Sequence, residues 1–215
     1  MRPIDKGQDR RLRDLSEARR LLSAQVGEYC AYCEIRLGSL EIEHIQPQST
    51  HPELVTDWSN LLLACGYCNK FKSNKPSDNC YFPHTHNTAL AFAYIASLPP
   101  APSDNLTDTQ RIMAQNTIDL AGLSRTSGQH QSRREGAYGH ARRAFMRLQQ
   151  QPDNDLLKEA TVDTATSTGF FSIWLTVFQD NPELCVRLIQ AFKGTARDCF
   201  DAQGKPADSR TRPLL

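Results

Sequence analysis

Two neighbouring stretches carry the residues that decide the fold: CAYCEIRLGSLEIEHIQP at residues 30–47 and DWSNLLLACGYCNKFKSNK at residues 57–75. Each stretch contains a C-x2-C pair, and 31 residues separate the two pairs. Two such pairs match the tetrahedral thiolate shell of structural zinc. We therefore predict one zinc site, with buried or redox-active thiols as the alternative. Its ligands are Cys30, Cys33, Cys65 and Cys68.

The segment that joins the two pairs predicts a β-hairpin, a polar loop and a short helix. Leu40 and Ile42 alternate with glutamates after a Gly-Ser turn, which is typical of a hairpin. Residues 46–56 are rich in turn formers and are expected to be a loop. The apolar run LLLAC then leads into a short helix that we expect to continue to Lys72.

The rest of the chain reads as helical, so we predict an α+β fold that is mainly α. The expected parts are an N-terminal arm and helix (1–27), a zinc-stapled ββα-metal core (28–80) and a helical lobe (81–215). Apolar spacing and capping residues predict the individual helices. These helices are expected at 9–26, 87–98, 108–122, 131–150 and 182–193. The apolar segment FFSIWLTVF at 170–178 predicts a buried helix or a strand. The tail after 203 is expected to be loose.

Charge is distributed unevenly along a chain of 215 residues whose formal net charge is only +1. Residues 37–110 carry 3 basic and 7 acidic side chains, which suits a site that collects a divalent cation. Residues 111–150 carry 7 basic and 2 acidic side chains. This basic stretch predicts a contact with nucleic acid or an acidic partner, or simply a solvated face. The chain has no apolar run long enough to cross a bilayer and no apolar secretion signal, so we expect a cytoplasmic protein.

Glu43 and His44 are candidates for chemistry because a histidine beside a carboxylate can act as a general base. Adjacent strand residues point to opposite faces, so one is expected to bind metal and the other to act as base. A structural role for the pair is the alternative. Asn69 is expected to cap the short helix or to bind a cation. Lys72 and Lys75 are expected either to lie beside a phosphate or to form a solvated face.

The order and spacing of these motifs resemble the zinc-bound branch of the HNH endonucleases. The resemblance implies that Glu43 is a metal ligand, His44 the general base, Asn60 an orienting residue and Asn69 the second metal ligand. Two positions depart from the commonest pattern, with Glu in place of Asp and Asn in place of His. The resulting all-oxygen ligand set favours Mg²⁺ or Mn²⁺. The resemblance also implies products with 5′-phosphate and 3′-hydroxyl ends.

A wider resemblance joins the opening MRPIDKG and the later NTIDLAGLSR (116–125) to the PtuB family of HNH subunits in Septu anti-phage systems. It implies an ATPase partner of the PtuA type, in some cases with a retron, and a helical lobe that serves as the docking surface. We expect DNA as the target more than RNA. The alternatives are the same chemistry on RNA such as tRNA, or a zinc-ribbon adaptor without catalysis.

Overall fold

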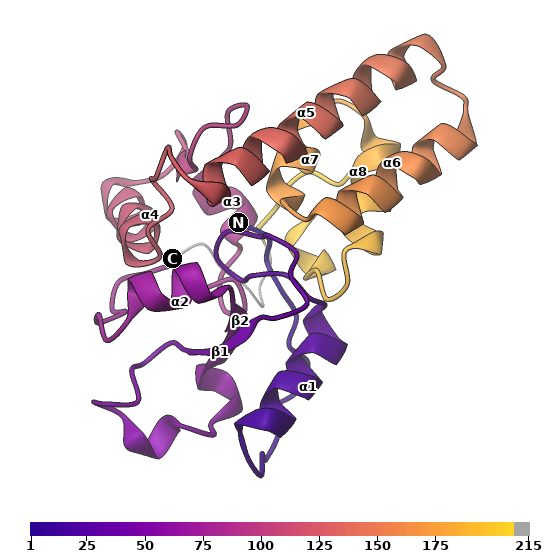
Figure 1. Cartoon of the computed structure of the whole chain (residues 1–215). Helices are drawn as coiled ribbons and strands as arrows, with labels where there is room; N and C mark the ends of the chain where they lie inside the picture. The colour runs from indigo at the N-terminus through magenta and orange to yellow at the C-terminus, as the bar shows by residue number, and fades with distance from the viewer. Residues whose placement is uncertain (209–215) are drawn as a thin grey trace.

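The computed structural model describes residues 1–208, in which helices outnumber strands (Figure 1). Two short antiparallel sheets accompany the helices within this range. The elements are α1 (Leu15–Val26), β1 (Glu41–His44), β2 (Leu61–Ala64), α2 (Gly66–Lys72), α3 (Thr88–Ala91), β3 (Phe92–Ala93), β4 (Ala101–Pro102), α4 (Asp108–Leu120), α5 (Gln129–Gln150), α6 (Asp155–Thr168), α7 (Phe171–Val177) and α8 (Pro182–Ala191).

The ββα core consists of β1, β2 and α2, but its strands pair differently from the prediction. The hairpin expected across Gly38-Ser39 is wrong, because β1 pairs with β2 in a register that sets His44 opposite Leu61. The residues before the turn form the first cysteine knuckle instead of a strand, with one bridge between Tyr29 and Arg36. The expected loop at 46–56 therefore lies between the paired strands in the chain. It contacts His44 at the end of β1 through Gln48 and Val55.

The N-terminal helix is shorter than predicted. It begins at Leu15 because the Asp14 side chain accepts a hydrogen bond from Glu17 N at 2.8 Å and caps the first turn. The preceding residues form an arm that enters the core. In this arm the Lys6 ammonium donates to the carbonyl oxygens of Trp58 and Leu61, which anchors the arm to the start of β2.

The helical lobe agrees with the sequence at α4, α5, α7 and α8, and differs in two places. The helix expected over 87–98 stops at Ala91, because the chain then forms β3, which pairs with β4. The apolar segment at 170–178, expected to be a buried helix or a strand, forms the buried helix α7. Helix α6 was not predicted. The expectation of a loose tail after Gln203 falls largely on residues outside the described range. Within the described range, Phe200 and Pro206 form a β-bridge.

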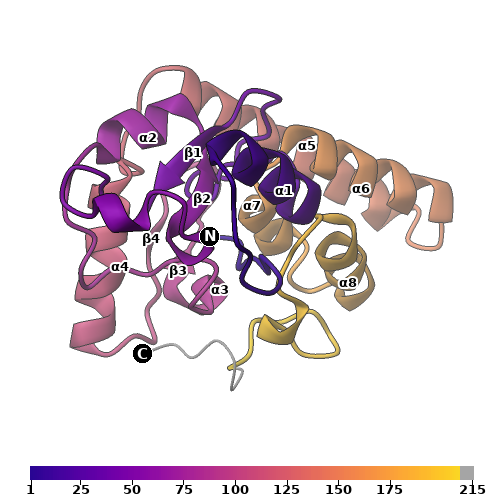
Figure 2. The same cartoon turned by 90° about the horizontal axis from the view of Figure 1, so that it is seen from below.

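Helices α5, α6, α7 and α8 gather on one side of the molecule, and α2 with the β1–β2 sheet lies on the other (Figure 2). Each side has its own hydrophobic cluster. One surrounds the sheet and includes Trp58 and Leu62, and the other includes Trp174 and Leu188. Within residues 1–208, no helix is both long enough and apolar enough to span a membrane.

Candidate active site

The four cysteines form one compact, buried group, as predicted. Their sulfur atoms all lie within 4.8 Å of one another. The Sγ atoms of Cys33 and Cys65 are 3.7 Å apart. A tetrahedral zinc ion with bonds of about 2.3 Å would hold its sulfurs about 3.8 Å apart, so the spacing fits zinc. Cys65 is also the N-cap of α2, since its sulfur accepts from Cys68 N.

Two contacts outside the cysteine pairs fasten this group to the helical lobe. His130, in the first turn of α5, places Nε2 3.3 Å from Cys65 Sγ. The buried Glu34, in the turn of the first knuckle, accepts from the backbone N of Ser172 at 3.0 Å and from its hydroxyl at 2.6 Å. Sequence analysis missed both roles, because each contact joins residues that are 65 or more positions apart.

An open pocket of about 370 Å³ lies between the end of β1, the following loop and α2. It brings together three of the predicted site residues: Glu43, His44 and Asn69. Asn60, Lys72 and Lys75 are not among its lining residues. The lining is completed by Ile42, Pro47, Gln48, Ser49, Ser73 and Asn74.

The imidazole of His44 is held at both nitrogens. Nε2 lies 2.9 Å from the carbonyl oxygen of Val55, which can only accept, so Nε2 carries the proton. Nδ1 then holds the lone pair, and it lies 2.8 Å from the side-chain amide nitrogen of Gln48. Burial lowers the pKa of His44 below its usual value of 6.5, and the nearby charge of Lys72 adds to this effect, while the Val55 hydrogen bond opposes it. His44 is therefore neutral at pH 7, as a general base must be.

Asn60 secures the loop that holds His44. Its Oδ1 accepts from Gln46 N at 2.7 Å, and its Nδ2 donates to the carbonyls of Gln46 at 3.1 Å and Leu54 at 3.3 Å. These bonds tie together the two ends of the loop, next to Val55. The hydrogen bonds of the Asn60 side chain are thus made to the loop and not to the His44 ring.

Glu43, which lines the pocket, forms a buried ion pair with Lys72, which lies behind it. Both side chains are at most 2% exposed, and Lys72 Nζ lies 2.9 Å from Glu43 Oε1. Tyr32 donates to the same oxygen at 3.3 Å. Burial raises the pKa of Glu43 to about 7, although the charge and hydrogen bond of Lys72 pull it down. Lys72 also donates to the His44 carbonyl at 2.6 Å, so its ammonium faces inward instead of toward a phosphate in solvent, unlike the expectation.

Asn69 lies in the middle of α2, so the expectation that it caps the helix is wrong. Cys65 takes that position instead. Asn69 Nδ2 donates to Glu41 Oε2 at 2.7 Å, and this leaves Oδ1 as the oxygen that can bind a cation. Sequence analysis missed Glu41, which precedes the expected ligand by two residues on β1. Lys75 is exposed, and its ammonium lies 3.9 Å from the centre of the Phe71 ring.

Residues 30–75 match the HNH endonuclease family. The matched HNH segment contains the four cysteines and every residue of the pocket described above. The chain is also similar to the Septu protein PtuB of Bacillus thuringiensis, with 44% identity over 52 residues. That alignment covers 22% of this chain and 20% of the relative, so the similarity concerns about a fifth of either protein.

Proposed function

We propose that this chain is an endonuclease of the HNH type that hydrolyses phosphodiester bonds in nucleic acid. The observation that supports this most directly is the convergence of Glu43, His44 and Asn69 on one open pocket within the HNH segment. These residues supply a neutral base and two oxygen donors at the same place. Such a combination suits attack of water on a phosphate.

In this proposal His44 Nδ1 removes a proton from water as the water oxygen attacks phosphorus. The bond from phosphorus to the 3′-oxygen breaks and this oxygen takes a proton from solvent water, which leaves 5′-phosphate and 3′-hydroxyl ends. The Val55 carbonyl stabilises the imidazolium that forms, since it already accepts from Nε2. Asn60 is the positioning residue that keeps this carbonyl in place.

Two metal sites belong to the proposal. The four cysteines hold structural zinc. Glu43 and Asn69 hold a catalytic cation, and their oxygen donors suit Mg²⁺ or Mn²⁺. Lys72 and Tyr32 both contact Oε1 of the Glu43 carboxylate, so Oε2 is the oxygen offered to a cation. When bound, such a cation neutralises charge on the phosphate and on the leaving oxygen.

The two lysines take different places in the proposed reaction. Lys75 is exposed three residues after the end of α2 and is the proposed phosphate contact. Lys72 supports the site from behind, where it neutralises Glu43 and fixes the backbone of His44.

The similarity to PtuB supports a biological setting. We propose that the chain is the effector subunit of an anti-phage defence complex in the cytoplasm, with an ATPase of the PtuA type and in some systems a retron. Residues 28–80 are the proposed nuclease core, behind the arm and helix of 1–27, and residues 81–215 are the proposed docking lobe. DNA is the preferred target over RNA.

One observation favours a zinc-ribbon adaptor as the second candidate. Both nitrogens of His44 are already hydrogen-bonded within the chain, as they would be in a purely structural histidine. The test is to purify wild type and His44→Ala with any co-purifying ATPase and to measure zinc, partner binding and phage protection. A nuclease loses protection in the variant but keeps zinc and partner. An adaptor keeps all three.

A further inference from the structure

A basic groove lies between α5 and α6, away from the pocket at His44. It has a volume of about 110 Å³. His140, Arg143 and Arg147 line it from α5, and Thr161 and Thr164 line it from α6. The three residues of α5 follow one another at three- and four-residue spacing, so they share one face of the helix. No acidic side chain is among the residues that line the groove.

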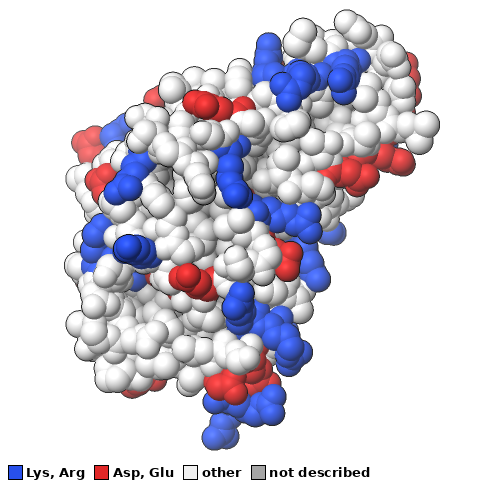
Figure 3. All heavy atoms as spheres, viewed as in Figure 1, with Lys and Arg blue, Asp and Glu red and all other residues white. Residues whose placement is uncertain are grey.

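The arginines of this face carry charge that the described chain does not neutralise. Within residues 1–208, no carboxylate lies within ion-pair distance of Arg143 or Arg147, nor of Arg133, which lies seven residues before His140 on the same side of α5. Arg143 only approaches a neighbouring imidazole, with 3.3 Å between its Nη2 and His140 Nδ1. Figure 3 shows Lys and Arg atoms gathered over the outer part of α5.

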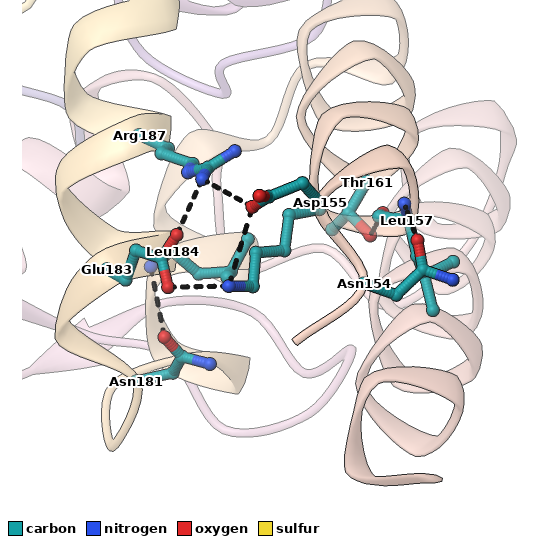
Figure 4. Close-up of polar contacts among 9 residues, drawn as sticks. Asn154, Asp155, Leu157, Thr161, Asn181, Glu183, Leu184 and Arg187 are labelled. Carbon is teal, nitrogen blue, oxygen red and sulfur yellow. Dashed lines mark hydrogen bonds and ion pairs between the residues drawn. The ribbon is translucent and has the colours of Figure 1, made fainter. Parts of the chain in front are cut away.

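The opposite side of α6 provides a contrast. There the cations are paired, since Lys158 lies 2.8 Å from Glu183 and Arg187 lies 2.9 Å from Asp155 (Figure 4). The network joins α6 to α8 and accounts for those charges structurally. The lobe thus neutralises these cations between α6 and α8, and it leaves the groove between α5 and α6 without a carboxylate.

We propose that this groove binds phosphates of the nucleic-acid backbone and extends the contact with the substrate beyond the nuclease pocket. The inference rests on the proposed function, in which the substrate is nucleic acid. Because the chain as a whole has a net charge of only +1, it needs a local basic surface to hold a polyanion. Guanidinium groups are the side chains best suited to phosphate oxygens.

The course of α5 supports the same occupant. Its first turn contacts the cysteine cluster through His130, so the helix starts at the HNH segment and leads away from it. The side chains from Arg133 to Arg147 span about 21 Å at 1.5 Å per residue, a length over which a duplex presents many phosphates. The groove's apolar lining is limited to Leu157 and two alanines, which is little for the hydrophobic centre of a protein interface.

The test measures binding without cleavage. Fluorescence anisotropy with a labelled 30-base-pair DNA duplex, and in a second arm with tRNA, is recorded without added divalent cation over a range of salt. The groove variant Arg143→Gln/Arg147→Gln is compared with Arg19→Gln/Arg111→Gln, which removes the same charge from two other exposed positions. For the DNA duplex, we expect the plot of log K for binding against log salt concentration to become shallower in the groove variant alone. The magnitude of its slope should decrease by about 2.

Either of two results would overturn the inference: an unchanged slope in the groove variant on both nucleic acids, or an equal fall in the control pair. The variant Arg143→Lys/Arg147→Lys keeps the charge and should keep the slope. Melting temperatures of all variants identify any that fail to fold. If the double variant fails, the single change Arg147→Gln replaces it, and the magnitude of the salt slope should then decrease by about 1. Wild type that binds through the groove but never cuts would refute the proposed nuclease and leave the groove intact.

Discussion

The side-chain amide of Gln48 lies 2.8 Å from Nδ1 of His44 and donates to the lone pair of the imidazole. Because Nε2 is committed to the Val55 carbonyl, Nδ1 is the nitrogen that can accept a proton from water. In the proposed mechanism Gln48 therefore occupies the position that the attacking water needs. It is an exposed residue of the loop after β1, and its side chain must move before the base can act.

Replacing Gln48 should expose this base. We expect Gln48→Ala to raise the cleavage rate of the isolated chain several-fold, because Nδ1 no longer has a competing donor. Ser49→Ala is the matched control, since Ser49 lines the same pocket and shows no contact with the ring. Steady-state cleavage of a labelled duplex measures both. A slower Gln48→Ala enzyme would mean that Gln48 assists the reaction instead of blocking it.

Asn60 should affect both stability and rate. Asn60→Ala leaves the amide of Gln46 without its acceptor and frees the Leu54 carbonyl, so we expect the free energy of unfolding to fall by about 2 to 3 kcal/mol. Cleavage should fall further than the loss of folded protein explains, because Val55 is no longer fixed. Urea unfolding and cleavage are measured together. Asn60→Asp keeps the acceptor for Gln46 and should lose less stability; equal losses would contradict the role given to Oδ1.

The cysteine cluster should hold one zinc ion on which folding depends. Cys33→Ser removes a ligand, so we expect loss of zinc and of the cooperative thermal transition. Cys185→Ser is the control, since Cys185 is buried in the other hydrophobic cluster, where its thiol donates to the Phe178 carbonyl. Elemental analysis and calorimetry check both proteins. Zinc retained at full stoichiometry in Cys33→Ser would remove Cys33 from the ligand set.

Binding of the catalytic cation should depend on pH through Glu43. Burial raises the pKa of this carboxyl from 4.5 to about 7, so below pH 7 the cation-free protein holds a proton there. This proton stabilises the fold at low pH, and the stabilisation is lost as the pH rises through about 7. A cation must displace the proton, so affinity for Mn²⁺ should rise by about tenfold per pH unit up to pH 7 and then level off.

Calorimetric titration of Mn²⁺ at several pH values, in buffers with different ionisation enthalpies, measures the affinity and the released proton. Glu43→Gln should bind weakly with no such dependence. An affinity for Mn²⁺ that does not change between pH 5.5 and 7 in wild type would contradict the assignment of Glu43 as a ligand.

Sequence reasoning succeeded where the determining residues are close together in the chain. The C-x2-C pairs identified the cysteine cluster, and long periodic segments identified α4 and α5. It failed at α6, whose inward residues are Lys158, Thr161 and Ala165 and therefore form no apolar stripe. It also paired the strands across the nearest turn, whereas the partner of β1 lies beyond a long loop.

For the site, the residue types in EIEHIQP and CNKFK identified three side chains that line the pocket. Their partners could not be predicted. The pairing of Lys72 with Glu43 and that of Asn69 with Glu41 both depend on how α2 packs against β1, about 28 residues away. From sequence alone, a lysine in a short polar helix such as α2 is predicted to face solvent, because its packing partners are not known.

The most direct test of the central claim is cleavage of supercoiled plasmid with Mn²⁺ by wild type and His44→Ala, matched for zinc content. A general base contributes about a hundredfold or more to the rate. We therefore expect wild type to leave ends with 5′-phosphates and the variant to cut at least about a hundredfold more slowly. Cleavage by His44→Ala at the wild-type rate would contradict the assignment of His44 as the base.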